Sequence, residues 1–316
     1  TTSQAYVYTG NGLTLNGQNS SFTQYTGTYG SKDLGWEKSY NWNVGLDYGI
    51  LNNRVDGSIE WFKTTTKGLL FKRTLPITSG LTGWGSPLSI WQNIAETSNQ
   101  GVEVTINSHN IKTKDFSWTT SLNLSHNKNK IVKLADLPEF IDGNYIRKEG
   151  CSYATIYLRE YAGVDPNDGR LMYYDNKEDE NGNRSRNIVY DPNDADRVEL
   201  KDIYPKLTGG LMNTFNYKFI DLSFNLSFHL GGYSYDGAMY ALQDDGYTAQ
   251  YNKSTELRRR WKQPGDITDV PRYVYGQEYG GWWNSSRGIH STDHLRLKKF
   301  DCWRFCSSVL VKNHRY

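Results

Sequence analysis

The chain lacks the long apolar runs from which membrane-spanning helices are built. No part of its 316 residues approaches the roughly 18 consecutive apolar residues that such a helix needs. The chain also opens on TTSQAYVYTG, without the charged start and apolar core of a secretory signal peptide. A mature secreted protein and a piece of a longer protein would both begin in this way. The sequence therefore predicts no transmembrane helix.

Residues that mark enzymes and metal sites are scarce. The three cysteines, Cys151, Cys302 and Cys306, form no C-x-x-C pair, and no neighbouring histidine completes a zinc set. The six histidines form no H-E-x-x-H motif, and no G-x-S-x-G accompanies the serines. We expect no catalytic residues, no cofactor, no metal ligands and no enzyme activity. His229, on the polar side of a predicted strand, is expected to have a structural role.

Charge is also low, since the formal net charge is only +2. This value argues against an acidic or nucleic-acid partner. Hydrophobic residues make up only 37% of the chain and the mean hydropathy is −0.72, yet 14% of the residues are aromatic. Many aromatic residues on a polar background are typical of an outer-membrane barrel, because half of each strand faces lipid while the loops are polar.

Residues Trp36 to Tyr48, WEKSYNWNVGLDY, have the clearest pattern near the start of the chain. Every second residue, through Trp42 and Leu46, is mainly aromatic or aliphatic, and the residues between are small or polar. This period of two indicates a strand and excludes a helix. The segment exceeds the usual five or six residues of a globular strand and reaches the roughly nine to eleven of a tilted membrane strand. We predict one face toward lipid and one toward a wet lumen.

Further segments alternate in the same way: Val55–Trp61, Val102–Asn107, Phe116–Ser125, Leu207–Tyr217, Ile220–Leu230 and, as the start of a seventh strand, Leu295–Lys298. Short links, at 49–54, 112–115 and 218, alternate with long stretches at 64–99, 127–206 and 231–291. Transmembrane barrels have tight turns on one side and extended loops on the other, whereas soluble domains rarely tolerate repeated long loops. The sequence predicts an all-β, antiparallel transmembrane β-barrel with short periplasmic turns and long extracellular loops. The alternative is a soluble all-β domain with a glycan-binding or structural role in the envelope.

Several of these stretches resemble the C-terminal part of the barrel in SusC/RagA-type TonB-dependent transporters of Bacteroidetes outer membranes. The matching stretches, in order along the chain, are DLGWEKSYNWNVGLDYGILNNRVDGSIEWF (Asp33–Phe62), LPITSG (Leu75–Gly80), NQGVEVTI (Asn99–Ile106), PKLTGGLMNTFNYKFIDLSFNLSFHLGG (Pro205–Gly232), RRWKQPGDITDVPR (Arg259–Arg272) and HLRLKK (His294–Lys299). One matching stretch alone would be weak evidence for the resemblance. Together, the stretches agree with the family in their order and spacing. The GLDYG and PGD-x-TD-x-PR stretches favour this branch over the siderophore- or cobalamin-type receptors, which are a second alternative.

The resemblance implies a barrel of about 22 strands, of which this chain holds about seven or eight. It also implies a plug domain and energy from TonB with ExbB and ExbD. A SusD-like surface lipoprotein that captures glycans or peptides would be a further partner. The plug and the TonB box are not found in this sequence, so the chain is expected to be a piece of a transporter that does not fold by itself. The expected role is active import across the outer membrane, in contact with its lipid, and the sequence does not specify the substrate.

Three regions are expected along the chain. Residues 1–33 read as loop with one strand, residues 34–300 as barrel, and residues 301–316 as an atypical tail that loses the alternating pattern. We interpret this tail as a reading-frame change or the edge of a gene.

Acidic loop segments 165–169, 175–182 and 191–196 have the composition of calcium loops but lack the twelve-residue spacing that ends in a glutamate. Turns are the main interpretation of these segments, with a calcium site left open. The basic run Arg258–Arg260 is interpreted as structural.

Aromatic residues divide by their place in the sequence. Those on predicted strands are expected to face lipid or its interfaces: Trp42, Tyr48, Trp61, Trp118 and Phe228. Those in long loops are candidate ligand-binding residues, which would stack on sugar rings or contact the lid protein: Trp84, Trp91, Tyr273, Tyr275, Trp282 and Trp283. Packing of the loops on themselves is the alternative.

Overall fold

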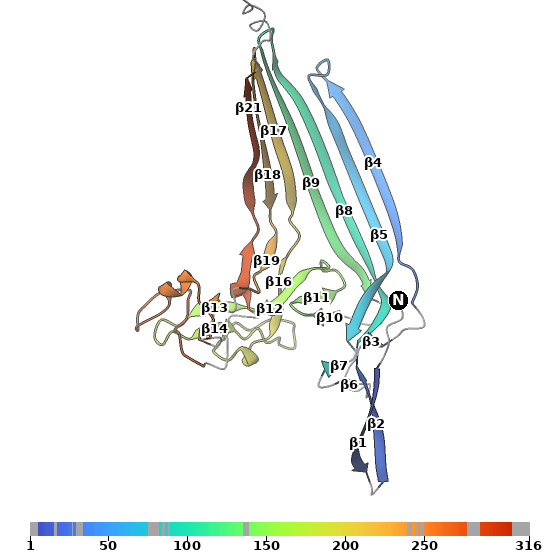
Figure 1. The fold of residues 1–316 in the computed structure, drawn as a ribbon, viewed down its shortest axis with the longest axis vertical. Coiled ribbons are helices and arrows are strands. Elements are labelled where there is room, and N and C mark those ends of the chain that lie inside the picture. Colours follow the sequence, from blue (N-terminus) through green and yellow to red (C-terminus); the bar gives the residue numbers. More distant parts are fainter. Residues whose placement is uncertain are drawn as a thin grey trace, which may run out of the picture.

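A sheet of long antiparallel strands dominates the structure (Figure 1). The computed structural model describes the backbone of residues 6–15, 18–26, 28–29, 34–74, 82–83, 86–87, 89–134, 139–238, 242–243, 245–246, 250–276 and 285–304, with side chains from residue 34 onward except at 74, 82–83 and 86–87. The strand order is β21-β18-β17-β9-β8-β5-β4, so strands that follow one another along the sheet also follow one another along the chain. No helix among these described residues has the length and apolar character needed to cross a membrane.

The long strands are β4 (Lys38–Ile50), β5 (Val55–Thr74), β8 (Ser89–Lys112), β9 (Phe116–Leu134), β17 (Leu207–Tyr217), β18 (Ile220–Leu230) and β21 (His294–Arg304). A short strand, β3 (Thr28–Tyr29), adds to β8 in parallel. Strands β4 and β21 are the two edges, so the sheet is open and forms part of a wall. The predicted fold class is confirmed, and predicted strands 207–217 and 220–230 coincide with β17 and β18.

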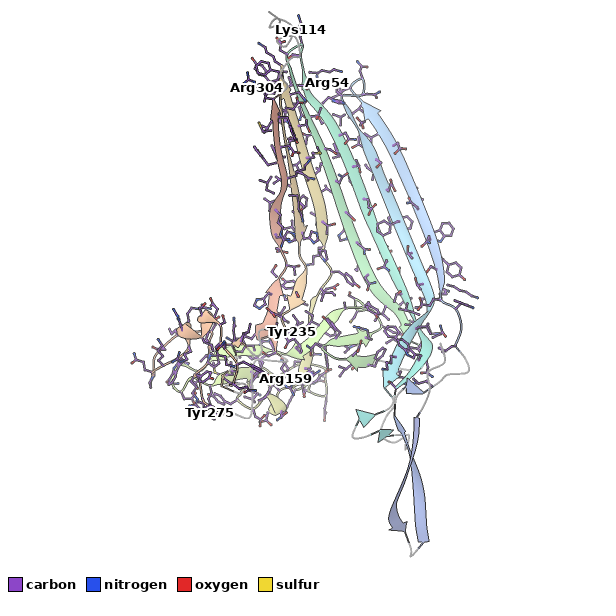
Figure 2. All side chains as sticks on the ribbon, in the orientation of Figure 1. Arg54, Lys114, Arg159, Tyr235, Tyr275 and Arg304 are labelled. Atoms are coloured by element: carbon purple, nitrogen blue, oxygen red, sulfur yellow. The ribbon has the colours of Figure 1, made fainter. Side chains whose placement is uncertain are left out.

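Tight turns join the strands at one end of the sheet. Leu51, Asn52 and Asn53 have positive φ between β4 and β5, and Lys218 does so between β17 and β18. Asparagine tolerates this left-handed conformation better than most residues, which explains the turn at Asn52 and Asn53. Figure 2 shows Arg54 and Lys114 at this end of the sheet, far from Tyr235 and Tyr275.

Cross-strand register places most apolar residues of these strands on one face, with Phe62 and Met212 among the exceptions. One row runs Leu46, Ile59, Val104, Leu124, Gly209, Phe228 and Leu295 from edge to edge. At Gly209 an added Cβ would lie 2.5 Å from the Phe228 ring, so the aromatic side chain occupies the space above the glycine. Leu46 and Leu295 are 65% and 68% exposed, so no part of the chain that the structure describes covers them. Such a surface suits lipid.

Three strands extend further into the predicted loops than the sequence indicates. The stretch 64–99 was expected to be irregular, but β5 continues to Thr74 and β8 begins at Ser89. A bulge at Gly68, which has a φ of +66°, shifts the register between Lys67 and Leu70 and hides the period of two. Strand β9 likewise continues to Leu134.

The start of the chain contains more strand than expected. Strands β1 (Tyr6–Leu15) and β2 (Gln18–Thr26) pair as an antiparallel hairpin, whereas the sequence indicated one strand in residues 1–33. Two short strands, β6 (Thr82–Gly83) and β7 (Ser86–Pro87), form another small pair. The expected tail is also shorter, since β21 includes residues 301–304, and residues 305–316 lie outside the described part of the chain.

Two long excursions form what we call the loop module, comprising residues 139–206 and the described parts of 231–293 (Figure 1). Its first excursion contains β10 (Glu139–Asp142), β11 (Tyr145–Lys148), β12 (Thr155–Arg159), β13 (Tyr161–Val164), β14 (Leu171–Tyr174), β15 (Ile188–Val189), the 3-10 turn η2 (Pro192–Asp194) and β16 (Arg197–Asp202). Its second contains β19 (Tyr233–Tyr235), η3 (Thr255–Arg259), η4 (Ser286–Gly288) and β20 (Ile289–Ser291). The stretches predicted as loops are therefore folded.

Two apolar clusters stabilise this end of the molecule. One comprises Val164, Leu171, Tyr173 and Ala195 inside the module. The other joins the module to the wall, because Phe71, Ala95, Ile131 and Leu134 of the long strands pack against Phe140 and Tyr153. The Phe71 and Phe140 rings meet edge to face at 5.3 Å. These two apolar clusters thus lie at the loop end of the wall, while the wall toward the turns is a single layer.

Candidate functional site

The polar face of the wall is the first candidate site. Its side chains hydrogen-bond to one another across neighbouring strands: Asn107 Nδ2 donates to Asp56 Oδ2 at 3.0 Å, Ser121 Oγ to Asn107 Oδ1 at 2.9 Å, and Thr105 Oγ1 to Asn123 Oδ1 at 3.1 Å. Each group remains in reach of water on its open side. A surface of this kind lines a wet channel well, because its donors and acceptors are fixed in direction but not buried.

A hollow of about 600 Å³ lies on this polar face. Paired residues Glu103, Ser125, Thr208 and His229 form one row across β8, β9, β17 and β18, and all four line the hollow. Ser125 Oγ lies 3.3 Å from Glu103 Oε1. Carboxylate, hydroxyl and imidazole groups in one row can hydrogen-bond a polar ligand at several points. The arrangement can bind and orient such a ligand.

A smaller hollow of about 330 Å³ lies nearer the turns on the same face. Asp56, Asn107, Met212 and Thr214 are among the residues that line it. The polar face is therefore hollowed at two levels between the loop end and the turn end.

The loop module is the second candidate site, and its two excursions hold each other through main-chain contacts. Trp261 Nε1 donates to the Pro166 carbonyl at 3.0 Å, and the Arg272 amide donates to the Gly169 carbonyl at 2.9 Å. Gly169 has a φ of +74°, and an added Cβ would lie 2.5 Å from the Trp261 ring. The DPNDG turn and the RRWKQPGD segment, distant in sequence, thus form one surface.

Carboxylates of the acidic segments cap turns within the module. Asp165 Oδ1 accepts from the Asn167 amide at 2.8 Å, Asp179 Oδ1 from the Asn183 amide at 2.8 Å, and Asp191 Oδ1 from the Asn193 amide at 2.8 Å. The hydrogen bond from the Tyr190 hydroxyl lowers the pKa of Asp165, and that from the Asn183 amide lowers the pKa of Asp179. These contacts support the interpretation of the segments as turns.

Arg259 of the basic run pairs with Glu256 at 2.5 Å and with Asp269 at 3.5 Å. These contacts lie within the module and agree with the structural role expected for the run. Across the described residues, no group of three or more histidine, cysteine or acidic side chains could hold a metal ion.

A charged pocket of about 310 Å³ opens on the sheet formed by β10, β11, β12 and β16. Lys148 Nζ lies 2.9 Å from Glu199 Oε1 and 3.5 Å from Glu139 Oε2. The hydrogen bond to Glu199 raises the pKa of Lys148, and burial raises the pKa of the nearby Cys151 thiol.

The predicted aromatic residues occupy different parts of the structure. Trp91 lies on β8, opposite Lys72 of β5, and is 42% exposed, so its assignment to a loop was wrong. The irregularity in β8 is at Ile94, which the pairing skips between Asn93 and Ala95. Tyr273 is half-buried and Tyr275 is 85% exposed, both in the module between η3 and η4. Trp84, Trp282 and Trp283 lie outside the described residues.

Sequence reasoning missed the row of paired residues on the wall and the contact between Gly169 and Trp261. The alternation of residue types showed which residues of each strand lie on the polar face. It could not align Glu103 with His229, because their alignment depends on three successive registers. The positive φ of Gly169 follows from its place in a DPNDG turn, but its aromatic partner does not.

Comparison with known proteins agrees with this architecture. Residues 2–149 match the family model described as TonB dependent receptor-like, beta-barrel. The chain is 32% identical to TonB-dependent receptor P3 of Formosa agariphila over 85% of this chain and 27% of that receptor, and 33% identical to TonB-dependent receptor SusC of Bacteroides thetaiotaomicron over 65% of this chain and 20% of SusC. It superposes on the RagAB peptide transporter with a TM-score of 0.75 at 26% identity, over 98% of this chain and 33% of that one.

The chain thus spans about a quarter of the length of the curated relatives, such as 27% of P3. Its relatives are receptors and transporters of the outer membrane rather than enzymes, and the soluble alternative is excluded. The open sheet is one part of their barrel wall. The chain therefore contains part of a TonB-dependent receptor β-barrel and is similar to SusC and to RagAB.

Proposed function

We propose that this chain forms part of an active importer that carries oligosaccharides or peptides across the outer membrane. The observation that carries the proposal is the two-faced wall, with an exposed apolar face and a hydrogen-bonded, hollowed polar face. In a closed barrel the apolar face contacts lipid and the polar face lines the lumen. Similarity to SusC and to the RagAB peptide transporter supports the import function.

Energy for import would come from TonB with ExbB and ExbD, acting through parts of the whole receptor outside this chain. A SusD-like surface lipoprotein would cover the loop end. Similarity to SusC and RagAB supports these partners over those of a siderophore- or cobalamin-type receptor. Substrate would bind at the loop end and pass the row from Glu103 to His229. No bond of the substrate is broken in this process.

Uptake by cells tests the function. A strain deleted for the full-length receptor gene, and the same strain with the gene restored, would be given radiolabelled mixtures of oligosaccharides or of peptides. We expect the restored strain to accumulate one of the two mixtures, with uptake lost when TonB is deleted. Equal accumulation of both mixtures by the two strains would contradict import of these classes.

The aromatic residues predicted as ligand-binding are proposed contacts of the substrate or the lipoprotein. Tyr275 is the best placed of the described ones, since at 85% exposure it is not engaged in packing of the loop on itself. Trp91, Tyr273 and, outside the described residues, Trp84, Trp282 and Trp283 are the other members. Tyr275→Ala should weaken capture of the lipoprotein or the substrate by the full receptor, measured by co-purification and by binding. Unchanged capture of both would remove Tyr275 from the proposed surface.

A further inference from the structure

Two histidines meet on the polar face of the wall at its loop end. His229 near the end of β18 pairs directly with His294 at the start of β21. The two imidazole rings lie 4.7 Å apart between centroids and are inclined by 26°. Directly opposed residues of an antiparallel pair have Cβ atoms about 4.5–5.5 Å apart, so both side chains can reach a common point. Their distance in sequence conceals this pair from any local motif.

A backbone contact fixes the orientation of one ring. His294 Nδ1 lies 2.8 Å from the Thr292 carbonyl oxygen. A carbonyl oxygen only accepts, so Nδ1 carries the proton and donates, which leaves the lone pair of the neutral ring on Nε2. Histidines that bind metal ions commonly donate their second nitrogen to a carbonyl in this way. His294 is thus held in the tautomer of a metal ligand.

A hollow beside the pair leaves space for an ion. His229 lines the hollow of about 600 Å³, together with Ser125, Thr208 and Lys298. Metal–imidazole bonds of about 2.0–2.1 Å place the two nitrogens of a tetrahedral site roughly 3.4 Å apart. In the structure the two rings are stacked, so both side chains must turn about their torsion angles before their nitrogens point at one ion. Glu103 lines the same hollow, three strand pairings away from His229.

We propose that His229 and His294 form a two-imidazole site for a divalent transition-metal ion on the lumen wall. Since no group of three or more candidate ligands occurs among the described residues, water completes the coordination. Two nitrogen ligands favour Cu²⁺, Ni²⁺ or Zn²⁺ over Ca²⁺ and Mg²⁺, with Cu²⁺ bound most tightly. The open positions of a bound ion would face the hollow, where oxygen or nitrogen atoms of a passing molecule can reach them.

Metal titration of the full-length receptor in detergent tests this site. The receptor would carry no histidine tag, would be stripped with chelator, and would be titrated with Cu²⁺ and with Ni²⁺ against a chromophoric competitor. We expect His229→Gln and His294→Gln each to weaken binding at least tenfold, and the double variant to be no weaker than either, because both rings act on one ion. His290→Gln is the matched control, since His290 lies on neighbouring β20 and pairs with Ser234. It should bind within twofold of the wild type.

Electron paramagnetic resonance of the Cu²⁺ form gives a second readout that does not depend on affinity. The wild type should show coupling to two imidazole nitrogens, and each single variant coupling to one. Migration of the unheated variants on gels will show that they remain folded barrels. Unchanged binding in His229→Gln, equal losses in His290→Gln, or coupling to one nitrogen in the wild type would each overturn the proposal.

Discussion

The wall and the loop module differ in where their apolar side chains lie: exposed on the wall and buried in the module. Strand β4 has exposed apolar side chains such as Trp42 and Val44, at 69% and 65% exposure, and it covers no core. Strand β12 in the module has Ile156 and Leu158, both at 0% exposure, inside a conventional apolar core. The wall therefore depends on lipid and on the rest of its barrel, whereas the module carries its own interior.

The two regions also use polar groups differently. On the wall, polar side chains share hydrogen bonds along an open face, as Ser121 does with Asn107. In the module, carboxylates cap individual turns, as Asp179 does. In the wall, the change in stability on substitution should therefore depend on which face of the sheet the residue lies on. In the module, it should depend on how buried the residue is and on its backbone conformation.

The largest effect is expected from a charge on the apolar face of the wall. Leu226 of β18 pairs with Leu211 and Leu297 on this face, whereas its neighbour Asn225 lies on the polar face. Leu226→Arg should destabilise the full receptor in liposomes by about 2–4 kcal/mol, because the guanidinium would enter lipid. Urea unfolding would measure the change, with Asn225→Arg as the matched control. Similar losses in both variants would contradict the assignment of the faces.

A smaller but substantial effect is expected in the module at Gly169. Gly169→Ala adds a Cβ that would meet Trp261 at 2.5 Å in a left-handed backbone, so local stability should fall by about 1–3 kcal/mol. Gly182→Ala is the control, because Gly182 has a φ of +81° but its nearest neighbour, Glu178, would be at 3.6 Å. Hydrogen exchange of the module amides measures both. If the two variants lost the same stability, the packing of Trp261 would have no special role.

Acid should loosen the module before it affects the wall. The pKa values of Asp165 and Asp179 are lowered from the ordinary 3.8 by hydrogen bonds in the folded state. Groups of this kind stabilise the fold above pH 3.8, and their contribution is lost as the pH falls through the lowered values. Hydrogen exchange, corrected for intrinsic rates, should therefore rise in the turns at 165–169 and 179–183 below about pH 4. Asp165→Asn should reduce this dependence in its own turn, while amides of β17 and β18 serve as the internal control.

The smallest effect is expected on the polar face. Ser121→Ala removes the donor to Asn107 Oδ1, but water in the lumen can replace it. The stability of the full receptor should change by no more than about 0.5 kcal/mol in urea unfolding. A loss as large as that of Leu226→Arg would mean that this face is buried against protein or lipid.

The sequence predicted the wall better than the module for a physical reason. Alternation of apolar and polar residues along 207–217 and 220–230 reports directly on a two-faced strand, and the predicted bounds equal those of β17 and β18. Irregularities at Gly68 of β5 and at Ile94 of β8 break that signal, so the alternation does not predict the outer parts of these strands or the place of Trp91.

The module could not be predicted because its strands are short and their partners are distant. Strand β12 pairs with β16, from Thr155 with Asp202 to Arg159 with Arg197, and no local pattern specifies that pairing. The same limit applies to the candidate site. The alternation of polar and apolar residues along 220–230 predicts that His229 lies on the polar face. Only the register of the folded sheet shows that it lies beside His294.

The central claim is that the long strands separate lipid from lumen. Spin labels placed singly along Ile220–Leu230 of the full receptor in bilayers test it most directly, after replacement of the native cysteines by serine. We expect high collision rates with oxygen at Leu222, Leu226 and Phe228 and low rates at Ser223, Asn225 and Ser227, with a period of two. Oxygen accessibility without that period, or highest at the serine and asparagine positions, would contradict the account.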